Sequence, residues 1–305
     1  MEALNKSLSI DNGYPKRAGT ELSETDCNIF KCRDKRIGLG SKTIIMGVLN
    51  LTPDSFFDGG NFTSVDRALR HVEKMITEGA NIIDVGGEST RPGSLGISMD
   101  EECGRVIPVI TEIKKNFDAI LSIDTTKSGV ADEAVKAGVS IINDISGLKF
   151  DDKIADVASE YKAGIVLSHT TAAPAVMQYN TNYDSLIEDI KLSLSHSVSI
   201  AIEKGVDKNS IIVDPGFGFG KTTEQNLMLL KNLGEICALG KPVLIGTSNK
   251  SFIGNILNAE IDDRVEGTAA TVAIGIANGA SVIRVHDIGY MKKVAEVVDA
   301  VMNVN

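Results

Sequence analysis

The sequence predicts a single (β/α)8 TIM barrel of the α/β class. Eight apolar runs of strand type alternate with amphipathic stretches of helical period, and polar side chains follow every run. Strands that alternate with helices pair in parallel through right-handed crossovers. Eight such units close into a barrel whose functional groups lie at the carboxyl ends of its strands. A doubly wound open sheet is the alternative architecture, but no GxGxxG turn follows the first run.

The composition fits one large domain and restricts its partners. The chain has 305 residues, 43% of them hydrophobic, which is enough for a full core. With 41 acidic against 31 basic residues the net charge is -10, which argues against nucleic acid as a partner. No signal peptide and no run of about 20 apolar residues is found, so no membrane partner is expected. Four cysteines without CxxC spacing indicate reduced thiols and a cytoplasmic location.

Two regions are expected along the chain. Residues 1–40 form a short polar N-terminal extension, with a hairpin in which NIFKC and RIGLG flank Arg33, Asp34 and Lys35. Residues 41–305 form the barrel. Its strands are expected, in order, at TIIMGVL, NIIDVG, AILSIDT, SIINDI, GIVLSH, IIVDPG, PVLIGTS and SVIRVHD.

Each strand is followed by a stretch with helical periodicity. Glycine closes several of these stretches, at Gly79, Gly138 and Gly279, because it readily adopts the left-handed conformation that ends a helix. The expected helices span residues 65–78, 99–116, 128–137, 154–161, 183–203, 222–233, 264–277 and 290–301.

Polar residues stand at the end of every expected strand. Burying an unpaired charge costs several kcal/mol, so a core would not select such residues there. In a barrel, all of these ends face one pocket. In strand order the residues are Asn50; Asp84, followed by the loop Glu88 to Gly93; Asp124; Asn143 and Asp144; His169; Asp214; Ser248 to Ser251; and Arg284, His286 and Asp287.

The chemistry of this ring suits a flat heterocycle that carries a phosphate group. The Asp214 carboxylate and the Asn143 amide can pair with an amidine-like edge, and Lys250 can donate to a ring carbonyl or nitrogen. Asn50 could offer a neutral oxygen to Mg²⁺. The cationic donors available to a phosphate or pyrophosphate are Arg91, Arg284 and His286.

Each of these residues also has a structural interpretation. Asp84 and Asp124 could cap the turns that follow them. A single histidine such as His169 is more often structural than catalytic, and the glycines of DPGFGFGK could form a flexible loop with Lys221 in solvent. The recurrence of polar residues at all eight strand ends favours the functional interpretation.

The motifs resemble those of the bacterial dihydropteroate synthases. The matching segments lie within residues 45–288, and the combination of GGESTRPG, SIDT, NDI and DPGFGFGK is specific to that family. The resemblance implies a transferase of folate biosynthesis and a sulfonamide target. Its reaction would condense 6-hydroxymethyl-7,8-dihydropterin pyrophosphate with 4-aminobenzoate, giving 7,8-dihydropteroate and pyrophosphate by an SN1-like, Mg²⁺-assisted path.

The resemblance also implies roles for individual residues and a homodimeric state. The pterin-binding positions are Asp124, Asn143, Asp214 and Lys250, and the catalytic set is Asp124, Lys250, Arg284 and His286. Pyrophosphate contacts are expected from Asn50, Arg91, Arg284 and His286, with Asn50 as the Mg²⁺ ligand. The 4-aminobenzoate pocket is expected to contain Phe56, Thr90, Pro92, Phe219 and Ser251.

Two departures from the family pattern leave alternatives open. Asn249 stands where the common SRKS motif has arginine, and Thr170 follows His169 where many members have methionine. Both are compatible with a pterin-binding paralogue that lacks catalysis. A methyltetrahydrofolate-binding methyltransferase domain would share the barrel and the Asp/Asn set, but it would have no reason to keep the TPDSF and STRPG loops.

Overall fold

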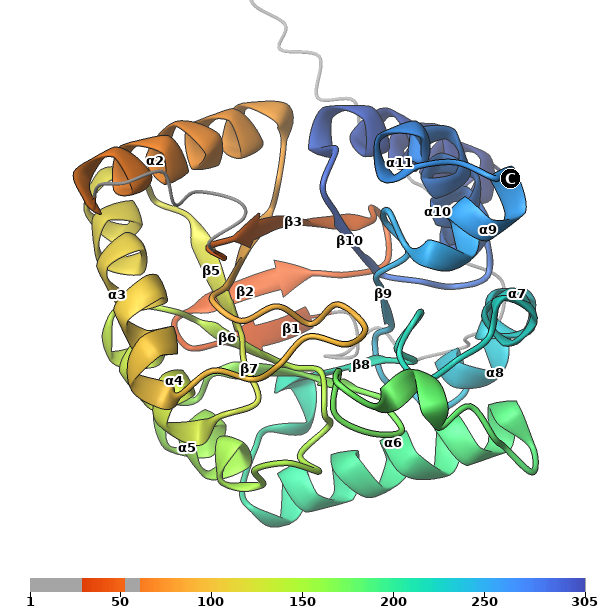
Figure 1. The fold of residues 1–305 in the computed structure, drawn as a ribbon, viewed down its shortest axis with the longest axis horizontal. Coiled ribbons are helices and arrows are strands. Elements are labelled where there is room, and N and C mark those ends of the chain that lie inside the picture. The colour runs from red at the N-terminus through yellow and green to blue at the C-terminus, as the bar shows by residue number, and fades with distance from the viewer. Residues whose placement is uncertain (1–28, 53–60, 305) are drawn as a thin grey trace, which may run out of the picture.

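The structure is a computed structural model that describes residues 29–52 and 61–304. Eight parallel strands lie in the order β8-β7-β6-β5-β4-β3-β10-β9, with helices around them (Figure 1). The strands are β3 (Ile44–Asn50), β4 (Ile82–Gly86), β5 (Ile120–Asp124), β6 (Ile141–Asp144), β7 (Gly164–Ser168), β8 (Ile211–Asp214), β9 (Leu244–Ile245) and β10 (Val282–Val285).

The two ends of this sheet meet and nearly close the barrel. A parallel bridge joins Val213 of β8 to Val243 just before β9, and the Val213 amide donates to the Pro242 carbonyl at 3.0 Å. The expected (β/α)8 barrel is confirmed. β9 is shorter than its sequence predicts, because the backbone leaves the ladder at Gly246 and begins a turn through residues 247–250.

The helices follow the strands as expected, with two differences. They are α2 (Asn61–Glu78), α3 (Met99–Asn116), α4 (Ser128–Lys136), α5 (Lys153–Tyr161), α6 (Leu186–Glu203), α7 (Thr223–Lys231), α8 (Leu233–Cys237), α9 (Ser251–Leu257), α10 (Val265–Ala277) and α11 (Ile288–Met302). The single helix expected at 222–233 is instead two, which meet at Asn232. The short α9 was not expected.

Local signals fix the helix ends. Ser98 accepts a hydrogen bond from the Glu101 amide at the start of α3, and acidic residues occupy its first turn while lysines occupy its last. Thr222 and Gln225 form a reciprocal capping box at the start of α7. These caps fix where α3 and α7 begin.

Side chains alternate along the strands between two environments. Outward residues such as Ile45 and Leu49 of β3 pack against the helices in the main core, whereas inward residues such as Met46 pack inside the barrel. The inward positions change from apolar to polar towards the carboxyl ends. On β4 the inward side chains change from Ile82 to Asp84, and on β5 they change from Ile120 through Ser122 to Asp124.

A hairpin covers the amino-terminal end of the barrel. β1 (Ile29–Cys32) and β2 (Lys35–Gly38) pair antiparallel and cross the middle of the ring of strands in Figure 1. Phe30 and Cys32 are 1% and 0% exposed and pack on the inward residues at the start of the strands. A side chain at Gly164 would collide with the Phe30 ring, so glycine is required there. Among the described residues, the hairpin thus covers the amino-terminal end of the barrel interior.

Candidate functional site

Arg284 lies at the centre of the carboxyl end of the barrel, between two aspartates. From β10 its Nε donates to Asp84 Oδ2 at 2.6 Å and its Nη2 donates to Asp124 Oδ2 at 2.7 Å. Burial alone would lower the pKa of Arg284, but these two carboxylates raise it. Burial also raises the pKa of Asp124 to about 7, against the lowering effect of Arg284. The cluster therefore holds more carboxylate than one guanidinium can neutralise.

Asn143 presents a buried oxygen to this site. Its Nδ2 donates to Asp84 Oδ2 at 3.0 Å. Its Oδ1 and the Oδ1 of Asp84 are buried and have no hydrogen-bond partner among the described residues. Buried polar atoms are almost always paired in native proteins. Two unpaired acceptors beside one another indicate that a ligand or water supplies the donors.

Asp214 lies at the end of β8, two strands along the barrel from Asn143 on β6 and opposite Asp84 on β4. Its Oδ1 accepts from the Gly216 amide at 2.8 Å, and its Oδ2 accepts from Ser168 at 3.3 Å. Burial raises the pKa of Asp214, and the Gly216 bond opposes that effect. The carboxylate is thereby fixed in orientation by backbone and hydroxyl donors.

Lys250 crosses the DPGFGFGK loop to reach the site. Its Nζ lies 4.0 Å from the centroid of the Phe219 ring, in a cation–π contact. A side chain at Gly218 would come within 3.0 Å of Lys250 Cδ, so the absence of one lets the lysine pass. Burial lowers the pKa of Lys250 to about 8, and Arg284 contributes to the lowering. Lys250 also precedes α9, whose first residue, Ser251, is exposed.

Lys221 is buried, so the interpretation that places it in solvent is wrong. Its side chain is 3% exposed, and its Nζ lies 3.1 Å from Nδ1 of His169, which is 4% exposed. Burial lowers the pKa of Lys221 to about 7. It also lowers the pKa of His169 to about 2, with a further contribution from Lys221. Both shifts favour the neutral imidazole, whose Nδ1 can accept from the Lys221 amino group.

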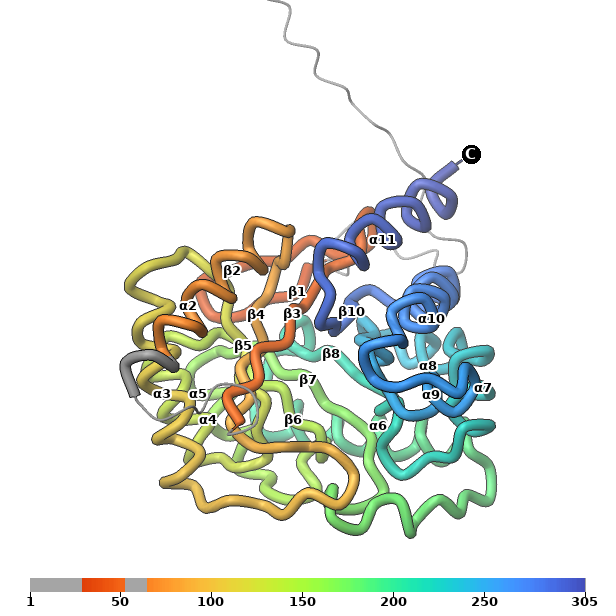
Figure 2. Tube along the Cα trace, turned by 45° about the horizontal axis from the view of Figure 1, so that its top comes forward, coloured from red at the N-terminus to blue at the C-terminus, as the bar shows by residue number. Residues whose placement is uncertain are grey.

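The loop after β4 carries three of the predicted residues to the rim. Thr90 is half-buried, whereas Arg91 and Pro92 are exposed. The Gly93 amide donates to the Pro174 carbonyl at 3.0 Å, which joins this loop to the one after β7. Figure 2 shows the two loops side by side along the lower edge of the molecule.

The base of this loop is held by an ionic cluster that sequence reasoning missed. Lys127 Nζ donates to Glu88 at 2.7 Å and to Glu102 at 2.6 Å, and the other Glu88 oxygen accepts from the Ile97 amide at 2.8 Å. Burial raises the pKa of Glu102, against its bonds to Lys127. These residues lie far apart in the sequence and carry no motif apart from the glutamate of GGESTRPG.

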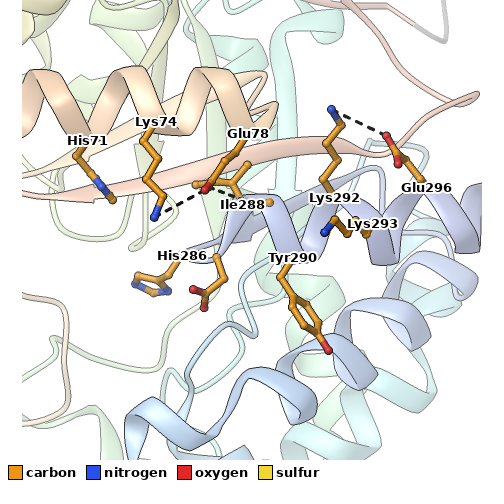
Figure 3. A pocket seen from close by; sticks show the side chains of 11 residues that line it. His71, Lys74, Glu78, His286, Ile288, Tyr290, Lys292, Lys293 and Glu296 are labelled. Atoms are coloured by element: carbon orange, nitrogen blue, oxygen red, sulfur yellow. Dashed lines mark hydrogen bonds and ion pairs between the residues drawn. The ribbon is translucent and has the colours of Figure 1, made fainter.

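His286 lies at the edge of the site and borders an open cavity. Its Nδ1 is 2.9 Å from the Ser248 hydroxyl, and the side chain is exposed. Figure 3 shows His286 beneath His71 and Lys74 of α2, beside the start of α11. The cavity has a volume of about 640 Å³. Its lysines are matched by Glu78, Asp287 and Glu296, so it offers no net positive charge to an anion.

Asn50 fits the expected Mg²⁺ site. It ends β3 and is half-buried, and no hydrogen bond to its side chain is found within the described part of the chain. Its Oδ1 and the Asp124 Cβ each lie 3.6 Å from the point that a Cβ atom would occupy at Gly86. The described residues contain no group of three or more His, Cys, Asp or Glu that could hold a metal. Mg²⁺ keeps several waters and binds through substrate phosphates, so this sparse set suits it.

The structure brings most of the predicted residues to one end of the barrel. Asp124, Asn143 and Asp214 are buried, and together with the half-buried Lys250 and Arg284 they form what is called here the buried group, with Phe219 against Lys250. Asn50, Thr90, Arg91, Pro92, Ser251 and His286 lie around it at strand ends and on loops. Phe56 lies outside the described residues.

The two departures from the family pattern have local structural roles. The Thr170 hydroxyl donates to the Ala172 carbonyl at 2.8 Å. Asn249 is in the left-handed conformation, with φ of 59°, which asparagine adopts more readily than arginine. Its carbonyl accepts from Arg264 at 3.0 Å. Neither side chain removes a donor or acceptor from the buried group.

Comparison with known proteins decides the family. The family of pterin binding enzymes matches residues 46–286. The dihydropteroate synthase of Bacillus subtilis strain 168 is 50% identical over 275 residues, which cover 90% of this chain and 94% of that protein. This chain belongs to the dihydropteroate synthases. It is therefore a transferase of folate biosynthesis.

Solved dihydropteroate synthases share the fold. The enzyme from Clostridium difficile, solved in the presence of pteroic acid, has a TM-score of 0.84 and 45% identity, covering 88% of this chain and all of that one. The enzyme from Xanthomonas albilineans, solved with 4-aminobenzoic acid, has a TM-score of 0.84 and 36% identity, covering 91% and 99%. These findings favour the dihydropteroate synthase interpretation over the methyltransferase one.

Proposed function

We propose that the buried group at the carboxyl end of the barrel is where the dihydropteroate synthase reaction takes place. This proposal rests on the pair of unpaired acceptors on Asp84 and Asn143, with the Asp214 carboxylate and the Lys250 ammonium at the same end of the barrel. A pterin ring carries N–H donors along one edge and a carbonyl and ring nitrogens that accept. The site offers the complementary set.

The pterin is held from three sides in this proposal. Asn143 and Asp214 accept from its amidine-like edge, and Lys250 donates to its carbonyl or a ring nitrogen. Asp124 faces the reacting end. Because Gly216 and Ser168 hold Asp214 in place, the carboxylate does not need to be ordered by the substrate.

The pyrophosphate group lies on the cationic side. Arg284 uses Nε and Nη2 for Asp84 and Asp124, and no hydrogen bond to its Nη1 is found among the described residues, so Nη1 can donate to a phosphate oxygen. Arg91 and His286 reach the same side from the rim. Guanidinium groups suit phosphate because several donors lie in one plane.

4-Aminobenzoate binds between the loops. Phe219 forms one wall, and Thr90, Pro92 and Ser251 form the edges. Phe56 would join them from outside the described residues. The arylamine then faces the CH₂ group of the pterin.

The reaction follows an SN1-like path. The bond between the CH₂ carbon and the pyrophosphate oxygen breaks, and its electron pair leaves with the pyrophosphate. The electron-rich pterin and the Asp124 carboxylate stabilise the cation that remains. The arylamine lone pair then forms the C–N bond, and its proton passes to solvent. A neutral arylamine is nucleophilic, so no strong base is required.

Mg²⁺ is the proposed cofactor, with Asn50 as its protein ligand. The bound ion would supply positive charge that neutralises the pyrophosphate. We expect Asn50→Ala to raise the Mg²⁺ concentration needed for half-maximal activity by about tenfold, with little change at saturating Mg²⁺. A Mg²⁺ titration of initial rates measures this. An unaltered Mg²⁺ requirement would remove Asn50 from the metal site.

Binding of the pterin tests the site itself. Asn143→Leu removes one acceptor and leaves the Asp84 carboxylate without its amide donor. We expect the Kd for a pterin substrate analogue, measured by calorimetry, to rise at least about tenfold. The matched control is Asn81→Leu, since Asn81 accepts from the Ile45 amide on the outside of the barrel. Equal affinity of parent and Asn143→Leu would contradict the proposed pterin pocket.

A cytoplasmic homodimer is the proposed state. No helix among the described residues is long and apolar enough to span a membrane. Ile274, Val297 and Val301 of α10 and α11 are 47%, 65% and 67% exposed, which supports an apolar contact there. Ile276 is fully buried and cannot contribute to it. Light scattering of the purified protein measures the assembly.

A further inference from the structure

The Lys221 amino group joins the loop that follows β8 to His169, which follows β7. Its Nζ donates to the Gly216 carbonyl at 2.9 Å, the Phe219 carbonyl at 3.0 Å and Nδ1 of His169 at 3.1 Å. An ammonium has three N–H donors, and here three acceptors satisfy them. Lys221 does not contact Asp214 or Lys250 by a hydrogen bond, so it is not part of the pterin-binding group.

The loop that Lys221 crosses has little rigidity of its own. Its glycines at 216, 218 and 220 all have positive φ, at 72°, 78° and 60°. Such a backbone has many accessible conformations in the absence of side-chain contacts. Side chains outside the loop hold three of its groups: Gln178 donates to the Gly218 carbonyl at 2.8 Å, Tyr183 donates to the Gly220 carbonyl at 3.0 Å, and Asn226 accepts from the Gly218 amide at 2.8 Å. Lys221 holds the carbonyls of Gly216 and Phe219, and the Gly216 carbonyl also accepts from the Phe219 amide at 3.2 Å.

The contacts of Lys221 with Gly216, Phe219 and His169 are called here the clamp. Phe219 connects the clamp to the site. The Lys221 ammonium holds the Phe219 carbonyl, and the Phe219 ring lies 4.0 Å from Lys250 Nζ. Phe219 is 7% exposed, so a shift of the loop would move the ring relative to Lys250. Asp214, in contrast, is held from the Gly216 amide and from Ser168, and these bonds do not require Lys221.

We propose that Lys221, with His169 as its partner, is a positioning residue that fixes the β8 loop so that Phe219 forms a stable wall for the second, aromatic substrate. The proposal rests on the proposed function, in which Phe219 lines the 4-aminobenzoate pocket. It assigns Lys221 an effect on one substrate rather than on both.

Lys221→Met tests this assignment, because methionine fills similar space but donates nothing. We expect KM for 4-aminobenzoate to rise by about tenfold or more, while KM for the dihydropterin pyrophosphate stays within about threefold. The matched control is Lys241→Met, which removes a lysine that precedes β9 and whose Nζ donates to the Lys208 carbonyl at 2.7 Å. This control should leave both constants within about twofold. No change in Lys221→Met, or an equal rise in both constants, would overturn the proposal.

His169 provides a second pair of variants in case Lys221→Met does not fold. Asparagine can place its Oδ1 near the position of His169 Nδ1, whereas leucine has no acceptor. His169→Asn should keep KM for 4-aminobenzoate close to that of the parent, and His169→Leu should raise it as Lys221→Met does. A role in packing alone predicts that both variants behave alike, which would contradict the clamp.

Hydrogen exchange separates this proposal from the proposed reaction. In the unliganded protein, Lys221→Met should speed exchange of the amides at residues 217–220 by about tenfold and leave those of Gly216 and α6 unchanged. Unchanged exchange at 217–220 would refute the clamp whatever the activity. If Lys221→Met shows faster exchange but the parent protein makes no dihydropteroate, the clamp is supported and the proposed reaction is contradicted.

Discussion

At the scale of single residues, the site is defined by charge that the fold does not neutralise. Arg284 is shared by Asp84 and Asp124, and both carboxylates are buried. A buried ion pair stabilises a fold only when its partners balance, and here one guanidinium serves two acids. The unliganded site therefore carries an electrostatic cost that the cationic or hydrogen-bonding parts of a substrate can offset.

Asp124→Asn should reveal this cost. Asp124 has a raised pKa in the folded state, so the stability it contributes is greatest at low pH and is lost as pH rises towards about 7. Asparagine does not ionise, so the variant does not lose this stability as the pH rises. We expect the Tm of the unliganded variant to exceed that of the parent by about 2–4 °C at pH 8, with the difference shrinking towards pH 5. Differential scanning calorimetry across this range measures it.

The same variant should lose function. Because Asp124 faces the reacting end of the pterin in the proposed site, turnover should fall by at least about tenfold. A variant that is less stable than the parent at pH 8, or one with full turnover, would contradict the role given to Asp124.

At the scale of elements, separate contacts hold the barrel and its loops. The C-terminal helix α11 is tied to the first barrel strand by Asp299, whose two oxygens accept from the Thr43 amide at 2.7 Å and the Thr43 hydroxyl at 2.8 Å. Figure 2 shows the end of α11 projecting beyond the barrel, so Asp299 anchors the helix near the point where it leaves the body. The functional loops are held instead by Lys127, Lys221 and Arg264.

Removing the Asp299 anchor should lower stability without altering catalysis. Asp299→Ala leaves the buried Thr43 amide without that acceptor, and we expect the free energy of unfolding to fall by about 2–3 kcal/mol. Urea denaturation measures the change. The control is Asp118→Ala, which breaks an exposed ion pair with Lys35 and should cost less than about 0.5 kcal/mol. A similar loss in both variants would show that Asp299 is not an anchor.

The elements also show why parts of the fold could be predicted and others not. The limits of α3 were predicted to the residue because Ser98 and the charged turns mark both ends. The break at Asn232 between α7 and α8 has no proline signal, and the nearby Gly234 lies inside α8 instead of at the break. The seven residues of α9 are too few for a periodic pattern. β9 contains two residues because it ends where the chain turns towards Lys250.

At the scale of the whole molecule, the grouping of the polar residues at the strand ends could be predicted from the sequence, because a parallel barrel brings the carboxyl ends of all its strands to one face. The sequence predicted Asp124, Asn143, Asp214 and Arg284 as neighbours, and the structure brings them together. It did not predict the burial of Lys221 or the cluster of Glu88, Glu102 and Lys127. Those contacts join loops that are separate in the sequence, and no local sequence pattern predicts them.

The most direct test is pyrophosphate release by the purified protein, given the dihydropterin pyrophosphate and Mg²⁺, with and without 4-aminobenzoate. We predict release that depends on 4-aminobenzoate, with 7,8-dihydropteroate formed in equal amount. No release despite measurable pterin binding would contradict it, and would identify a pterin-binding protein without catalysis.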